Sequence, residues 1–293
     1  MASPKVLADR SGSRVVAAAV LLACAICSSA QVQFRLAPRE VIENRLKSFS
    51  RKNTEREGLI KSWLAESGCK LSNLTEEPKD RPFPPNVICV LPGETAEVIL
   101  VGAHTDYVET RGDGVVDNWT GASLLPSLLY SIGGQRRHHT FVFVGFSAEE
   151  KGLLGSLIYA ADLTPEQRSR IAGMVNIDSL GLGPTKVWVT HADKILLGPL
   201  TEIATSTKLP IAEMDVDNLG SADSEAFADY NIPRITLHSV TKETWRILHS
   251  SADKLNAVKM SDYYDSYHLI AAYLAYLDYK LGNVPNVAPK APK

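Results

Sequence analysis

The segment EVILVGAHTD, residues 97–106, is the strongest indication of the fold class of this chain. Its apolar run EVILVGA is followed at once by His104 and Asp106. A second run of the same kind, TFVFVGFSA, precedes Glu149 and Glu150. Strands that are buried on both faces of a parallel sheet read as continuous runs of Val, Ile and Phe. The sequence therefore predicts an α/β fold with a mixed, mostly parallel central sheet and helices on both of its faces.

Three further side chains with ligand chemistry follow apolar segments. They are Asp117 in VVDN, Asp178 after GMVNI and His249 in RILHSSADK. Open α/β sheets bind their ligands in the crevice outside the carboxyl ends of the strands. We therefore expect these side chains to meet those that follow the first two strands.

The expected set has the composition of a metal site. Two imidazoles and three carboxylates without a thiolate suit Zn²⁺, with Mn²⁺ and Co²⁺ as weaker matches. A single acid at a strand end is usually a helix cap or a solvated residue, but several acids near a buried sheet end repel one another unless a cation compensates them. Five ligands exceed the three that one catalytic zinc takes from a protein, whereas two ions that share one carboxylate would use all five. The set is His104, Asp117, Glu150, Asp178 and His249, which leaves Glu149 free as a general base.

Six segments carry a resemblance to a known family: AHTD, DNWTG, SAEEKGLLGS, NIDSLG, SADSEAF with NIP, and LHSSADKL. Between about Arg45 and Leu277 the chain resembles the secreted zinc aminopeptidases of clan MH, in motif order and in spacing. The family resemblance implies a three-layer zinc-exopeptidase fold and two zinc ions. One ion would bind His104 and Asp178, the other Glu150 and His249, with Asp117 as the bridge, Glu149 as the general base and Asp106 as the outer partner of His104.

The resemblance implies hydrolysis of the N-terminal peptide bond of peptide substrates. One alternative is a glutaminyl-peptide cyclotransferase, which shares the fold but works with one zinc. Another is a non-catalytic binding domain of the transferrin-receptor type, which missing ligands would indicate, and none of the five is missing. The loop before Asp223 has no obvious Tyr or His to stabilise an oxyanion, so that role stays open.

The termini differ from the middle of the chain. Lys5, Arg10 and Arg14 precede the apolar run VVAAAVLLACAI and a small-residue cleavage site, a pattern typical of a secretory signal peptide over residues 1–30. The apolar run is too short to span a bilayer. We therefore expect a secreted or periplasmic protein without stable membrane insertion after cleavage. Residues 31–281 should form a single zinc-peptidase domain, and residues 282–293, rich in Pro, Ala and Lys, a disordered tail.

The charge and the cysteines narrow the function further. A formal net charge of −2 argues against nucleic acid as a partner. Cys69 and Cys89 lie outside the signal segment, and an exported pair of cysteines is more often a disulfide than a catalytic thiol. The sequence leaves open whether these two pair.

Several local elements can also be predicted. Thr54 and Glu57 match a capping box, and apolar spacing predicts a helix from there to Gly68. The runs NVICVL and EVILVGA, joined by PGETA, predict an antiparallel hairpin. In GASLLPSLLYSI, Pro126 predicts a kinked helix or a late helix start.

The remaining histidines are expected to lie outside the site. His138 and His139 precede TFVFVGF, at the opposite sheet edge from Glu149, and are interpreted as solvated loop residues rather than ligands. His191 and His238 end apolar strands, and His268 lies in a C-terminal helix, so all three are interpreted as structural.

Overall fold

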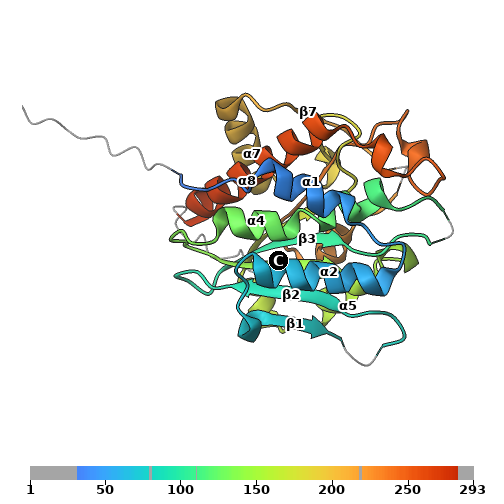
Figure 1. Cartoon of the computed structure of the whole chain (residues 1–293). Helices are drawn as coiled ribbons and strands as arrows, with labels where there is room; N and C mark the ends of the chain where they lie inside the picture. The colour runs from blue at the N-terminus through green and yellow to red at the C-terminus, as the bar shows by residue number, and fades with distance from the viewer. Residues whose placement is uncertain (1–31, 79–80, 110, 218–219, 283–293) are drawn as a thin grey trace, which may run out of the picture. The chain divides into compact units, whose positions relative to one another are not determined.

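The computed structural model describes residues 32–78, 81–109, 111–217 and 220–282. Within them, eight strands form one sheet in the order β1-β2-β4-β3-β5-β8-β6-β7. Strands β1 and β2 lie side by side at one edge of this sheet (Figure 1). The predicted signal peptide and tail fall outside these residues, except that Gly282 ends the last helix. The strands are β1 (Leu74–Glu77), β2 (Asn86–Leu91), β3 (Val98–His104), β4 (Thr140–Phe146), β5 (Ile171–Ile177), β6 (Thr185–Val187), β7 (Ile211–Glu213) and β8 (Arg234–His238).

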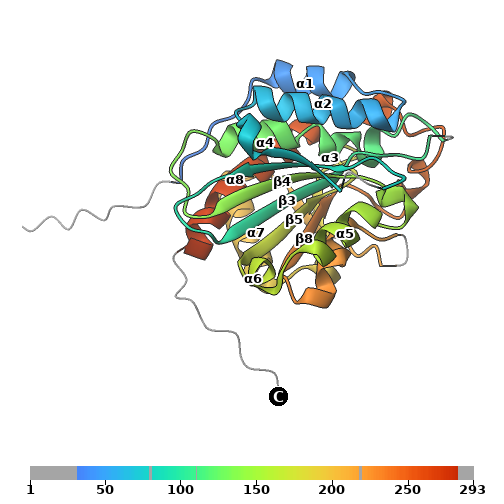
Figure 2. The same ribbon diagram turned by 90° about the horizontal axis from the view of Figure 1, so that it is seen from below.

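The sheet is mixed and mostly parallel, which confirms the predicted fold class. Strands β4, β3, β5 and β8 run parallel to one another at its centre (Figure 2). The antiparallel pairs are β1 with β2, β2 with β4, and β6 with β8. The carboxyl ends of four consecutive neighbours therefore point to one edge of the sheet.

The predicted hairpin of β2 and β3 is wrong, because β4 lies between these two strands. The connection after β2 pairs with the segment before β4 instead: the Glu94 and Thr95 N–H groups donate to the carbonyls of Arg137 and His138, both at 2.9 Å. At Gly93 a side chain would collide with the carbonyl of His139, so a glycine permits this close approach. Residues 141–146 of β4 are all buried, which an inner position between two strands provides.

Helices cover both faces of the sheet, as predicted. Along β3, Val101 belongs to the core beneath α1, α2, α4, α7 and α8, whereas Leu100 belongs to the core on the opposite face beneath α5 (Figure 2). No helix of the described residues is long and apolar enough to cross a membrane. The helices are α1 (Arg39–Lys47), α2 (Asn53–Glu66), α3 (Thr120–Ala122), α4 (Leu125–Ile132), α5 (Leu154–Asp162), α6 (Pro165–Ser169), α7 (Lys194–Thr207) and α8 (Met260–Gly282).

The starts of two helices can be compared with the starts predicted from the sequence. Helix α2 forms as predicted, but its N-cap is Lys52, whose side chain makes no capping hydrogen bond. The predicted capping box is wrong because the helix begins at Asn53, so Thr54 lies inside it rather than at the cap, and Glu57 is buried. Helix α4 begins at Leu125 with Pro126 in its first turn, which confirms the late start.

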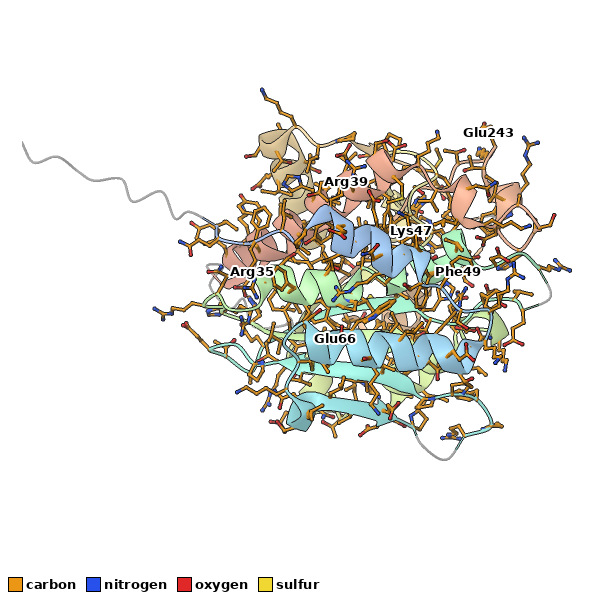
Figure 3. The ribbon with its side chains drawn as sticks, viewed as in Figure 1. Arg35, Arg39, Lys47, Phe49, Glu66 and Glu243 are labelled. Carbon is orange, nitrogen blue, oxygen red and sulfur yellow. A yellow bond between two sulfur atoms is a disulfide. The ribbon has the colours of Figure 1, made fainter. Side chains whose placement is uncertain are left out.

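The first two helices are tied to the rest of the domain. A disulfide joins Cys69, just after α2, to Cys89 in β2. From α1, the Arg45 guanidinium donates to Ser127 at 2.7 Å and to Ser67 at 2.8 Å. On the same helix, Arg39 and Lys47 extend toward solvent and both pair with Glu43 (Figure 3).

Candidate metal centre

The structure brings the six expected ligand and base residues to the carboxyl edge of the parallel strands. His104 ends β3, Glu149 and Glu150 follow β4, and Asp178 follows β5. A cavity of about 320 Å³ opens above them. Its lining includes Asp117, Glu149, Glu150, Asp178 and His249.

Asp117 lies at the centre of the cluster and contacts both imidazoles. Its Oδ1 atom is 3.2 Å from Nε2 of His104, and its Oδ2 atom is 3.1 Å from Nε2 of His249. Each carboxylate oxygen thus faces a different histidine. This is the arrangement that a carboxylate bridging two ions requires.

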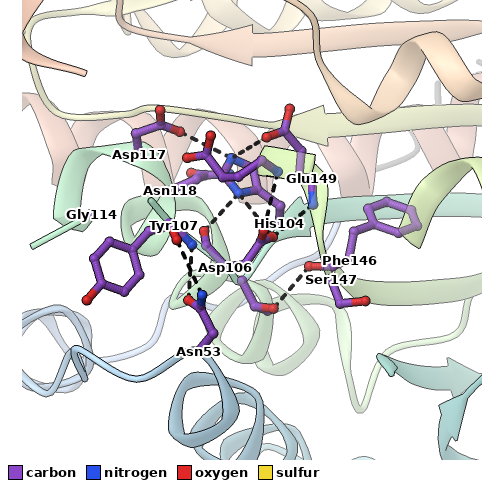
Figure 4. A network of polar contacts seen from close by, with 12 residues as sticks. Asn53, His104, Asp106, Tyr107, Gly114, Asp117, Asn118, Phe146, Ser147 and Glu149 are labelled. Carbon is purple, nitrogen blue, oxygen red and sulfur yellow. Dashed lines mark hydrogen bonds and ion pairs between the residues drawn. The ribbon is translucent and has the colours of Figure 1, made fainter. Parts of the chain in front are cut away.

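Each imidazole has a second carboxylate within reach. Nε2 of His104 lies 3.6 Å from Oδ1 of Asp178, and Nε2 of His249 lies 2.8 Å from Oε2 of Glu150. Glu149 is farther from His104, at 3.9 Å (Figure 4). The ligand atoms therefore fall into two groups, His104 with Asp178 and Glu149, and His249 with Asp117 and Glu150.

The contact of His104 with Asp106 differs from the expected one. Nδ1 of His104 donates to the backbone carbonyl of Asp106 at 3.1 Å, while the nearest carboxylate oxygen is 3.8 Å away. Because a carbonyl can only accept, Nδ1 carries the proton and Nε2 is the nitrogen that can bind a metal. The Asp106 carboxylate accepts the N–H groups of Glu149 and Glu150 instead, at 3.0 and 3.2 Å.

Buried amide and carboxylate groups hold the Asp117 turn in place. Asn118 donates to the carbonyl of Ile177 at 2.9 Å and accepts the N–H of Ser179 at 3.0 Å, which joins the turn to the end of β5. The Asp253 carboxylate accepts the N–H groups of Val116 and Asp117, at 2.7 and 3.2 Å. Asp253 was not among the residues expected from the sequence, although it lies in the same LHSSADKL motif as His249.

Three residues with left-handed backbone adjoin the site. Ala148, Ser179 and His249 have φ values of 53°, 54° and 53°. Side chains other than glycine adopt this region rarely, and such residues cluster at functional sites. Each of the three is itself a site residue or directly precedes or follows one.

The charges of the cluster are strongly perturbed. Burial raises the pKa of Glu149 well above its usual range, an effect that nearby Asp223 and Asp178 reinforce. Burial opposes ionisation of Asp117 too, but hydrogen bonds from His104 and His249 hold its pKa well below the usual range. The hydrogen bonds with Asp117 and Glu150 raise the pKa of His249 to about 10.

This donor set fits a divalent metal ion such as zinc. Imidazole nitrogens and carboxylate oxygens are the ligands that zinc takes in proteins when thiolates are absent. Oε1 of Glu150 is buried without a hydrogen-bond partner, and carboxylates buried in this number are costly unless a cation offsets their charge. The residues present are therefore suited to hold the ions that the sequence pattern predicts.

Two tryptophans and a histidine that the sequence did not assign to the site line the same cavity. Trp188 and Trp245 contribute to its walls. Nδ1 of His238 accepts the N–H of Val240 at 3.2 Å, so Nε2 carries the proton, and the backbone of Met214 also hydrogen-bonds the ring. The signal for His238 in the sequence is its position directly after the segment RITL, at the carboxyl end of a strand.

Comparisons with known proteins identify a family and relatives that this chain resembles. The model of the family described as Peptidase family M28 matches residues 86–274. The leupeptin-inactivating enzyme 1 of Streptomyces exfoliatus is 28% identical over 151 residues, which are 50% of this chain and 34% of that protein. The chain thus spans about a third or less of the length of the curated relatives it matches.

Solved structures share the fold. A zinc aminopeptidase from Bacillus subtilis matches with a TM-score of 0.60 and 20% identity, over 65% of this chain and 49% of that one. A glutaminyl cyclase from an Acidobacteriales bacterium matches with a TM-score of 0.68 and 15% identity, over 82% of this chain and 93% of that one. At these identities the likeness concerns the fold.

Proposed function

Because the chain belongs to peptidase family M28, we propose that it is a zinc-dependent aminopeptidase that removes N-terminal residues from peptides. The observation that carries the proposal is the position of Asp117, with one carboxylate oxygen toward His104 and the other toward His249. Two ions are proposed, one held by His104 and Asp178 and the other by His249 and Glu150, with Asp117 shared. Bound zinc ions supply a water of lowered pKa and polarise the scissile carbonyl.

Glu149 is proposed as the general base. Its carboxylate lines the cavity but lies 3.9 Å from His104, the longest of the contacts to that imidazole. The backbone N–H of Glu149 donates to Oδ1 of Asp106 at 3.0 Å. This bond fixes the position of the backbone that carries the Glu149 side chain. From there Glu149 can take a proton from water and pass it to the leaving amine.

His238 is proposed to bind the substrate carbonyl or its developing oxyanion. Its buried ring lines the cavity, with Nδ1 accepting the N–H of Val240 and the backbone of Met214 as its other hydrogen-bond partner. Burial, with the nearby charge of Lys186, lowers the pKa of His238 to about 4, so the ring is a neutral donor at neutral pH. A donor that is already in place costs no reorganisation when charge develops.

The cavity walls favour an apolar side chain at the substrate N-terminus. Beyond the polar floor, the lining is formed by large or aliphatic residues. A side chain bound there would lose contact with water, which is favourable for Leu-like or aromatic groups. The apolar wall residues are Trp188, Val216, Ala222, Val240, Trp245 and Leu248.

The second candidate is a glutaminyl-peptide cyclotransferase. It is favoured by the extent of the structural match, since this chain covers 93% of the solved glutaminyl cyclase but 49% of the solved zinc aminopeptidase from Bacillus subtilis. Five intact ligand positions favour the peptidase, because the cyclotransferase works with one zinc.

One experiment separates the two candidates. The full chain, loaded with zinc, is incubated with Leu-Gly-Gly, with its N-acetylated form, and with a peptide that begins with glutamine, and the products are identified by mass spectrometry. An aminopeptidase releases free leucine and leaves the acetylated peptide intact. Cyclisation of the glutaminyl peptide without release of any residue would instead establish the cyclotransferase.

Export from the cytoplasm is also proposed. The basic and apolar pattern of residues 1–30 supports it, and so does the Cys69–Cys89 disulfide, which suits an oxidising compartment. N-terminal sequencing of the protein from extracellular or periplasmic fractions should find a chain that begins near residue 31. A chain that stays cytoplasmic with residue 1 intact would contradict export.

A further inference from the structure

The opposite edge of the sheet holds a second cluster of metal-ligating side chains. Glu97 directly precedes β3, and His138 and His139 directly precede β4. One ligand atom from each lies within 4.8 Å of the others. Because β3 and β4 are parallel, the cluster lies at their amino ends, a seven-residue strand or about 23 Å from the candidate metal centre.

His139 is not the solvated loop residue that the sequence predicted. Its side chain is 1% exposed, because the start of β4 packs against Asp278 of α8. The Asp278 carboxylate accepts the backbone N–H groups of His138 and His139, at 3.0 and 2.8 Å. His138 is partly exposed to solvent, as predicted, with 37% of its side chain accessible.

The ring of His139 is oriented as metal-binding histidines are. Its Nδ1 atom lies 2.9 Å from Oδ1 of Asp278, and since the carboxylate accepts, Nδ1 carries the proton. Nε2 is therefore the atom with a free lone pair. It is buried, has no hydrogen-bond partner, and faces Oε2 of Glu97 at 3.8 Å. A carboxylate behind the ring and an ion in front of it is the usual surrounding of a histidine ligand.

The other two side chains complete the cluster. Nε2 of His138 lies 3.7 Å from the same Oε2 atom of Glu97, and the two imidazole rings are 4.9 Å apart. The two distances to Oε2 of Glu97, 3.7 Å from His138 and 3.8 Å from His139, are too long for hydrogen bonds. They are close to the separation of about 3.3 Å between ligand atoms around a tetrahedral ion with bonds of about 2.0 to 2.1 Å. Glu97 and His138 are each about one-third exposed, so an ion can reach the cluster from solvent.

We propose that Glu97, His138 and His139 form a second, non-catalytic site for a divalent transition-metal ion. Two imidazoles and one carboxylate are ligands for zinc and for neighbouring ions such as Co²⁺ and Ni²⁺, and the charges of Glu97 and Asp278 offset that of the cation. The ion links the starts of β3 and β4 and, through the bond from His139 to Asp278, the end of α8. An ion that binds only the folded state stabilises it.

Calorimetric titration of zinc into the chelator-treated full chain tests the site. Glu97→Gln and His138→Gln remove a ligand while leaving the buried His139 in place. His268→Gln is the matched control, since it removes a histidine that belongs to neither cluster. We expect the wild type and the control to bind one zinc per chain more than either ligand variant, and to gain more in Tm from added zinc.

Two outcomes would overturn the proposal. Equal zinc stoichiometry in the wild type and both ligand variants at saturation would mean that the histidines form only ion pairs with Glu97. A loss of the ion together with peptidase or cyclase turnover would mean that the ion is catalytic. Stoichiometry is counted without any substrate, so the result does not depend on which reaction the chain catalyses.

Discussion

Oδ1 of Asp106 accepts a hydrogen bond from the backbone N–H of Glu149 at 3.0 Å. Oδ2 of the same carboxylate accepts the N–H of Glu150 at 3.2 Å. One side chain from the loop after β3 thus holds the turn after β4 that carries two site residues. Asp106 therefore positions the proposed base, Glu149, through this turn. The backbone carbonyl of Asp106 also accepts Nδ1–H of His104.

Asp106→Asn should therefore lower kcat/KM as well as metal affinity. An asparagine side chain keeps one acceptor and turns a donor toward the second N–H, and losing a hydrogen bond to a charged group costs about 1.5 to 3 kcal/mol. We expect a loss of roughly 10- to 100-fold in kcat/KM. Steady-state kinetics and zinc titration measure the two effects separately. Wild-type values for both would make Asp106 an ordinary loop acid.

Glu149→Gln should abolish turnover while the metal stays bound. An amide cannot take a proton from water, so kcat should fall by at least ~100-fold. Glu150→Gln is the matched comparison and should lose zinc, because Glu150 contacts His249 at 2.8 Å. Metal analysis of both variants after gel filtration provides the readout. Zinc loss in Glu149→Gln would reassign this residue as a ligand.

Asp117→Ala should lose both ions of the cavity, because each of its oxygens faces a different histidine. His104→Ala should chiefly weaken the ion shared with Asp178. Zinc is counted in the His138→Gln background, so that an ion at the opposite edge of the sheet is not included. A parent that never exceeds one zinc per chain in that background contradicts the bridging role and favours the cyclotransferase.

His238→Ala should reduce kcat/KM without changing the zinc content. The loss of one donor to a developing oxyanion costs about 2.7 to 4 kcal/mol, or roughly 100- to 1,000-fold. His238→Gln retains an N–H donor and should recover part of the activity. Because the pKa of His238 is lowered to about 4, the pH profile above pH 5 should have the same shape in the wild type and the Gln variant. Full activity of the Ala variant would exclude this role.

Glu57→Gln should stabilise the fold at alkaline pH. Burial, with repulsion from Asp106 and Glu76, raises the pKa of Glu57 from 4.5 to about 8. The folded protein therefore holds a proton there that the unfolded chain releases, so stability falls as the pH rises through this window. Below pH 4.5 the variant should gain nothing, and between pH 4.5 and about 8 its gain should grow by about 1.4 kcal/mol for each pH unit and then level off. Thermal unfolding of the wild type and the variant at pH 4, 6 and 9 measures this gain in stability. The same stability difference at all three pH values would contradict the raised pKa of Glu57.

The fold class and most residues of the candidate site could be predicted from the sequence alone. Continuous apolar runs mark strands buried on both faces, and ligand-type side chains follow their carboxyl ends, so His104, Glu150 and Asp178 could be expected to meet before any coordinates were known. This works because both signals are local: a strand and the residue after it are contiguous in the chain.

The order of the strands and the contacts of each polar atom depend on the three-dimensional packing of the chain. A short turn after β2 suggested a hairpin, but the burial of β4 between β2 and β3 decided the strand order. The bonds of Asp106 to the turn after β4 and the packing of His139 against α8 join segments that lie far apart in the sequence. Such contacts depend on packing between elements, which leaves no periodic pattern in any one of them.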